Sequence, residues 1–124
     1  MIIFSLLLIL SCDMTTNYHD LNSIREAENM LFYDVLDGSV EDIDVYELPY
    51  YLSEGDSVGW DFIYYHIEQD SWFFFIDDCP FAYWGHPCRY VFITVESNIE
   101  IEVTVINETN PPDCYDEMIQ IFQE

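Results

Sequence analysis

The chain has 124 residues, 51% of them hydrophobic and 18% aromatic, which suits one domain with a packed core. It carries 25 Asp and Glu against two basic residues, Arg25 and Arg89, for a net charge of -23 at pH 7. This balance excludes nucleic-acid binding through phosphate contacts, which needs clustered Lys and Arg, and it favours a cation or a basic partner.

The first twelve residues, MIIFSLLLILSC, have the features of an export signal. Residues 2–10 are apolar except for Ser5, a run that suits the core of a signal peptide, whereas a membrane-spanning helix needs about 20 residues. Residues 9–12 resemble a bacterial lipobox, in which the cysteine is lipidated and becomes the new N-terminus. This interpretation predicts an exported lipoprotein held to a membrane through Cys12. No Lys or Arg precedes the run, so an ordinary secretion signal and a buried first strand stay open as alternatives.

The rest of the chain divides into a short polar tether and a single domain. Residues 13–20 are polar and without periodicity, as expected of a tether, and residues 21–124 form the predicted domain. Ser23 and Glu26 make a capping box, apolar residues follow at helical spacing, and Gly38 supplies a stop. We expect a helix over residues 24–36.

Strand patterns follow the helix. A short strand is expected within residues 40–49, a loop at 50–59, and a hairpin of residues 60–67 with 71–77. A second pair joins residues 89–96 to 99–106, where apolar and polar residues alternate as in a half-buried strand.

The predicted class is α+β, with the N-terminal helix packed on a four- to five-stranded antiparallel sheet. Beyond Pro111 and Pro112, residues 113–122 are expected to form a short C-terminal helix, because Met118, Ile119 and Phe122 would share one of its faces.

The strand at residues 71–77 is apolar on both faces. Trp72 and Phe74 lie on one face and Phe73 and Phe75 on the other, whereas a single helix covers only one face. Either both faces are core, with the loop at 46–59 covering the second, or one face is a docking surface. We name Trp72 and Phe74 as candidate binding residues.

The loop at residues 77–88 gathers two cysteines, one histidine and two aspartates. A disulfide between Cys79 and Cys88 is one prediction, and closing this loop would stabilise the fold by about 2–3 kcal/mol. A zinc site using both cysteines, His86 and an aspartate is a second, and a thiol nucleophile at Cys88 with His86 as base is a third. Tyr83, Trp84 and His86 are further candidate binding residues. We predict no resident metal and no cofactor, and Cys114 has no assigned partner.

Residues 71–112 carry a resemblance to a family. A Trp-rich strand ending in Asp77-Asp78 is followed by PFAYWGHPCRYVFI, a hairpin and two prolines. The stretch resembles the propeptide-like, PepSY-related N-terminal domains of secreted bacterial peptidases. The resemblance implies a domain that acts by binding, as an inhibitor or folding aid, either alone or at the front of a longer protein.

The sequence therefore predicts an exported acidic binding or accessory module that acts by protein–protein contact and is not an enzyme. An enzyme based on Cys88 and His86, or on a metal there, is one alternative. An acidic mimic of nucleic acid is another. A protein partner is expected, with no nucleic-acid ligand; the sequence indicates no class of small-molecule substrate.

Overall fold

The computed structural model describes residues 19–20, 23–83, 85–97 and 100–123. Cys12, the apolar leader and most of the predicted tether lie outside these residues. Within the described residues, no helix is long and apolar enough to cross a membrane.

The predicted helix is confirmed, with a change of form in its second half. α2 (Ile24–Met30) begins after Ser23, whose side-chain oxygen accepts a hydrogen bond from the Arg25 N–H at 3.2 Å. The helix continues as a wider π-helical turn, η1 (Leu31–Val35). Gly38 then takes a φ of 78° and donates its N–H to Phe32, which ends the helix.

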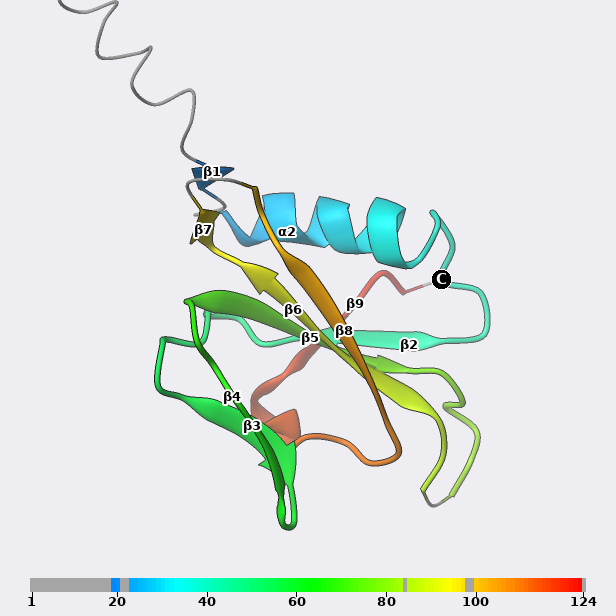
Figure 1. Ribbon diagram of the computed structural model, residues 1–124. Helices are drawn as coiled ribbons and strands as arrows, with labels where there is room; N and C mark the ends of the chain where they lie inside the picture. Colours follow the sequence, from blue (N-terminus) through cyan, green and yellow to red (C-terminus); the bar gives the residue numbers. More distant parts are fainter. Residues whose placement is uncertain (1–18, 21–22, 84, 98–99, 124) are drawn as a thin grey trace, which may run out of the picture.

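One antiparallel sheet of five strands forms the centre of the domain and confirms the predicted α+β class (Figure 1). Its order is β8-β6-β5-β2-β9. The strands are β2 (Asp44–Glu47), β5 (Ser71–Asp77), β6 (Cys88–Thr94), β8 (Val103–Glu108) and β9 (Ile119–Ile121). A separate two-stranded pair joins β1 (His19–Asp20) to β7 (Glu96–Ser97).

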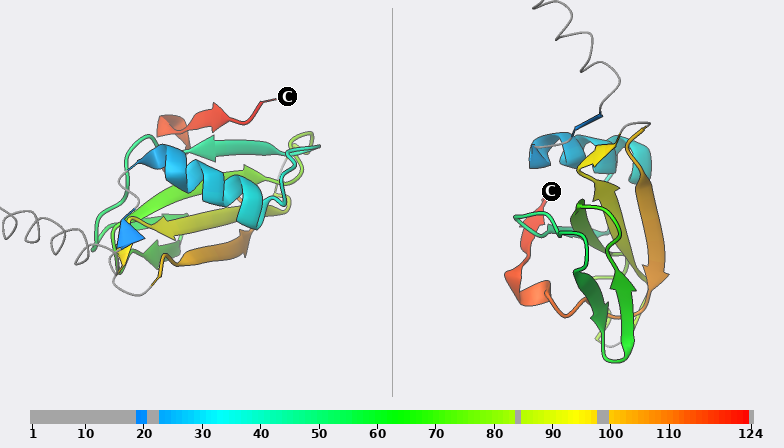
Figure 2. Two further views of the ribbon diagram at one scale, coloured as in Figure 1. Left: turned by 90° about the horizontal axis from the view of Figure 1, so that it is seen from above. Right: turned by 60° about the vertical axis from the view of Figure 1, so that its left-hand side comes forward.

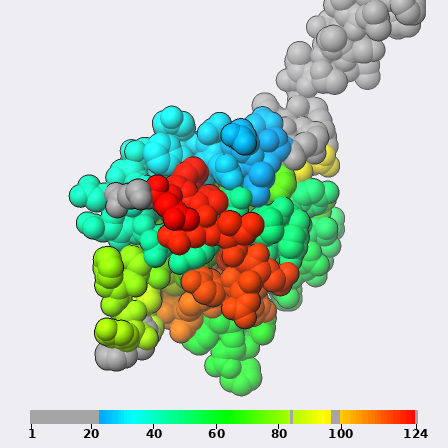
Figure 3. Space-filling model, turned by 180° about the vertical axis from the view of Figure 1, so that it is seen from behind, coloured from blue at the N-terminus to red at the C-terminus, as the bar shows by residue number. Residues whose placement is uncertain are grey.

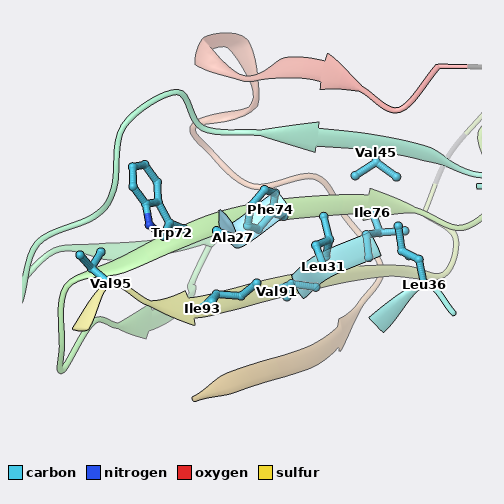
Figure 4. Close-up of a cluster of buried hydrophobic side chains, with 10 residues drawn as sticks. All are labelled: Ala27, Leu31, Leu36, Val45, Trp72, Phe74, Ile76, Val91, Ile93 and Val95. Atoms are coloured by element: carbon cyan, nitrogen blue, oxygen red, sulfur yellow. The ribbon is translucent and has the colours of Figure 1, made fainter. Parts of the chain in front are cut away.

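The helix covers one face of the sheet. Ala27 and Leu31 of the helical segment meet Phe74, Val91 and other apolar side chains of β5 and β6 (Figure 4). Burying such side chains is worth about 1.5–3 kcal/mol each, so this cluster ties the helix firmly to the sheet.

The opposite face is covered by a hairpin and by the C-terminal segment. The hairpin consists of β3 (Ser57–Trp60) and β4 (Ile63–His66), and η2 (Tyr115–Glu117) is a 3₁₀ turn. Seen from behind, the C-terminal segment lies between the helix and the hairpin (Figure 3). The buried members of this second core are Leu48, Leu52, Val58, Ile67, Phe73, Phe75, Cys88, Tyr90 and Phe92.

Two predicted elements are wrong. Residues 60–67 do not pair with 71–77, because the chain turns at Asp61 and Phe62 and β4 pairs with β3 instead, which places a strand in the predicted loop at 50–59. Residues 113–122 do not form an α-helix. After η2 they extend as β9, whose backbone pairs with the edge of β2, and this sheet pairing replaces the hydrogen bonds of a helix.

The elements give the domain two distinct ends (Figures 1 and 2). The chain enters at β1, whereas the tip of the β3–β4 hairpin and the loop at 78–87 lie at the far end.

Candidate binding groove

An open groove of about 590 Å³ lies between β4 and the β6–β8 part of the sheet. Figure 2 shows β4 as the hairpin strand nearer to β8. The groove is lined by Tyr64, Tyr65, His66, Ile67, Glu68, Gln69, Ser71, Phe92, Thr94, Glu102, Thr104 and Ile106.

The floor of the groove is the part of the sheet face that the hairpin does not reach. Phe92 pairs with Thr104 across β6 and β8, and Ile106 follows two positions along β8, so all three side chains point to the same face. Thr104 is exposed, and Ile106 is partly buried against the second core. The floor is thus a mixed apolar and hydroxyl surface.

The wall of the groove is β4, whose outer backbone edge forms no ladder with the strands that the structure describes. Ile67 donates to Asp56 across the hairpin, and because alternate residues point the same way, Tyr65 and Ile63 also face β3. Tyr64 and His66 therefore turn their N–H and C=O groups outward, and no strand among the described residues pairs with them. The other edge of the hairpin is covered, since Asp113 donates its N–H to Gly59 at 2.7 Å.

Glu108 of β8 holds the hairpin in place. Its carboxylate accepts hydrogen bonds from Trp60 Nε1, at 2.9 Å, and from the Tyr65 hydroxyl. Burial raises the pKa of Glu108, but the hydrogen bonds from Tyr65, Trp60 and the Thr109 N–H outweigh it and leave the pKa lowered. The ionised carboxylate is therefore the form that fixes β4 above β8.

The charge of the groove is negative. Glu68 and Glu102 line it, and no Lys or Arg does. Arg25 lies on α2, and Arg89 makes two hydrogen bonds to Asp78, at 2.7 and 2.9 Å. Neither arginine offsets the carboxylates of the groove.

Two of the binding residues predicted from the sequence are core residues instead. Trp72 is 6% exposed and Phe74 is fully buried, both beneath the helix (Figure 4). Their face of the sheet is closed, so the prediction that they form a docking surface is wrong. The other face of β5 is core too.

The loop at 78–87 presents aromatic side chains to solvent. Tyr83 is 92% exposed and Phe81 is 86% exposed, and Trp84 lies outside the described residues. His86 Nε2 lies 2.8 Å from Asp77 Oδ1, and with the Arg89–Asp78 pair this contact fixes the base of the loop. His86 therefore positions the loop and does not line the groove.

The predicted disulfide between Cys79 and Cys88 is not seen in the described residues, where Cys79, Cys88 and Cys114 are free thiols. Cys88 lies directly opposite Asp77, not Cys79, and it turns inward so that its Sγ is 3.6 Å from the Asn110 carbonyl oxygen. Cys79 is exposed. The described part of the chain contains no group of three or more His, Cys, Asp or Glu placed to hold a metal, and the zinc ligands considered above are not assembled.

A buried carboxyl group lies on the helix side, away from the groove. Glu47 of β2 is 8% exposed, and within the described structure its Oε1 has no hydrogen-bond partner. The pKa of Glu47 is raised to about 8, mainly by burial and to a smaller extent by the hydrogen bond and the negative charge of Glu28.

Sequence reasoning did not find the groove, because its residues come from three separated segments. One signal was present: polar Glu102 and Thr104 alternate with apolar residues in the strand predicted at 99–106, as in a half-buried strand. No protein-family model, curated protein or solved structure matches this chain.

Proposed function

We propose that the protein is an exported binding module that acts by contact with another protein, and that the groove beside β4 is its contact site. The observation that carries this proposal is the groove itself. It combines an open floor, two carboxylates without a basic Lys or Arg, and a strand edge with which no described strand pairs. In the described residues, the rest of both sheet faces is covered.

The state of the thiols supports binding rather than thiol catalysis. Burial, together with the charges of Asp77, Glu108 and Asp78, raises the pKa of Cys88 to about 12. A nucleophilic cysteine needs the opposite shift and an adjacent base. His86 is engaged with Asp77, and Cys88 faces the Asn110 carbonyl.

Export and a lipid anchor at Cys12 belong to the same proposal. The support is the apolar leader and its lipobox-like end. Since the chain enters the domain at β1, a lipid anchor would leave the hairpin tip and the loop at 78–87 on the distal end, towards solvent (Figure 1). The propeptide-like resemblance of residues 71–112 supports an inhibitor-like or accessory role for such a module.

Site-directed photo-crosslinking tests the contact site. A photoreactive amino acid is introduced at Thr104, in the groove floor, and in a separate variant at Tyr33, which is 67% exposed on the helical segment. Both variants are expressed in the organism that makes the protein. We expect a discrete crosslinked product from Thr104 and none from Tyr33. Equal labelling from both positions, or none from either, would refute the groove as the contact site.

Mass spectrometry of the mature protein tests export separately. A mature chain that begins at a lipid-modified Cys12 is the expected result. A chain that still carries residues 1–11 would overturn this part of the proposal.

A further inference from the structure

We propose that the groove binds an extended, positively charged segment of a partner protein, which adds as a third strand to the outer edge of β4. This inference rests on the proposed function and specifies the chemistry of the partner.

The first argument is the incomplete second layer. A two-stranded hairpin lies over a five-stranded sheet, and the hairpin leaves the β8 side of that face open. Packed sheets lie about 10 Å apart, so a strand beside β4 would lie at the height of the hairpin and above β8. A third strand would complete the layer where the groove now lies.

The second argument is the backbone. The outward N–H and C=O groups of Tyr64 and His66 are the groups to which an added strand binds. The lining runs from Tyr64 of β4 past the end of the strand to Gln69, about six residues, and an added strand rises roughly 3.3 Å per residue. Among the described residues no strand pairs with the outer edge of β8 either, but the groove lies beside β4.

The third argument is the pattern of side chains that the groove would accept. Alternate residues of an added strand would face the floor, where Phe92 and Ile106 offer apolar contact. Glu68 and Glu102 lie at the groove as well and would attract Lys or Arg. The fitting segment therefore combines apolar and basic residues.

The charge argues against a second copy of this chain as the occupant. Each copy carries a net charge of -23, and two of its carboxylates, Glu68 and Glu102, lie at the point of contact. Like charges brought together at an interface cost several kcal/mol.

The test uses a blocked peptide of about six residues in which Lys and Val alternate, and a second peptide with Glu in place of Lys. We expect the Lys peptide to bind at least about 10-fold more tightly than the Glu peptide. Backbone N-methylation separates strand addition from charge attraction alone. Alternate N–H groups of a strand point to opposite edges, so only one set, that of Val or that of Lys, faces β4. Methylation of that set should abolish binding, and methylation of the other set should leave binding unchanged.

Two protein variants locate the site. Tyr64→Pro removes an outward N–H, at an edge position of the kind where proline is tolerated, and should weaken binding at least about 10-fold. Thr104→Lys places a bulky positive charge on the exposed floor and should weaken it similarly. Val105→Lys is the matched control, since Val105 is exposed on the other face of the same strand. Circular dichroism verifies the fold of each variant.

Equal binding of the Lys and Glu peptides, no effect of either methylation, or dimerisation of the protein through β4 would each overturn the inference. These outcomes are separable from failure of the proposed function. A crosslinked partner at Thr104 without selective peptide binding would support the groove as the contact site and refute strand addition to β4. Selective peptide binding without a crosslinked partner would support strand addition and refute the groove as the contact site in the organism.

Discussion

Replacement of Glu47 with Gln should remove a pH-dependent loss of stability. Glu47 lies on the helix side of β2, almost completely buried, and its pKa is raised to about 8 by burial and by the neighbouring Glu28 carboxylate. Burial destabilises the ionised carboxylate of Glu47 relative to its neutral acid form in the folded protein. Gln keeps the size and polarity of the side chain and cannot ionise.

The sign and the size of the effect follow from proton linkage. Because the folded protein holds this proton more tightly than the unfolded chain, the stability that it contributes is complete below pH 4.5 and is lost as the pH rises to about 8. At about 1.4 kcal/mol per pH unit, this interval sets an upper limit of about 5 kcal/mol. Since the structure relaxes around a buried charge, we expect about 2–3 kcal/mol.

Urea unfolding followed by tryptophan fluorescence measures the effect, at about pH 5 and about pH 9. Glu47→Gln should be more stable than the natural protein at the higher pH by about 2–3 kcal/mol, and the difference should shrink at the lower pH. Glu41→Gln is the control, because Glu41 is an exposed carboxylate in the turn before β2. The same pH slope in Glu47→Gln and the natural protein would refute the reasoning. An equal gain from Glu41→Gln would assign the effect to net charge.

Alkylation of the native protein near pH 8 should modify exposed Cys79 at least about 100-fold faster than Cys88, because burial raises the pKa of the Cys88 thiol to about 12. Peptide mapping over time measures both rates. Equal rates, or the absence of a free thiol at both positions, would contradict this prediction. Gly59→Ala should destabilise the protein by more than about 3 kcal/mol in urea unfolding, since the added Cβ would overlap a backbone oxygen of β4. Gly85→Ala, where the nearest contact is 3.6 Å, should cost under about 0.5 kcal/mol, and similar losses in the two variants would count against the packing described. Glu108→Ala should lower the free energy of unfolding by about 1–3 kcal/mol through the loss of the two hydrogen bonds from the hairpin, and an unchanged urea midpoint would show that this carboxylate does not anchor it.

Local signals predicted much of the fold. Ser23 and Gly38 mark the ends of the helix because capping depends on neighbouring residues only. The alternation in residues 99–106 predicted the strand β8, and its pairing with β6 followed from the short connection. These features need no knowledge of distant parts of the chain.

The errors arose where tertiary contacts decide the structure. Residues 60–67 form a continuous aromatic and β-branched run, but Asp61 adopts a positive φ of 54° and the chain turns within the run. The extension of residues 119–121 depends on pairing with β2, and a local pattern does not show that partner.

The candidate groove was not predicted. The aromatic loop that the sequence singled out does not line the groove, although Tyr83 is exposed on it. Trp72 and Phe74 were assigned to a docking face because one helix was too little cover for two apolar faces. The hairpin and the C-terminal segment cover the second face of the sheet, and the groove is the part of that face beside β4 that they leave open.

The pairing of β9 with β2 has a consequence for how the protein folds. β2 pairs with β5 through a moderate stretch of chain, but its other edge pairs with residues 119–121, far away in sequence. Contacts between distant segments form slowly, because the chain loses the entropy of closing a long loop before the contacts contribute any stabilisation. Until β9 docks, β2 presents an open edge on which chains can associate. Refolding at raised protein concentration should therefore lose material to aggregation before β9 docks, and the mutual repulsion of the acidic chains opposes that loss.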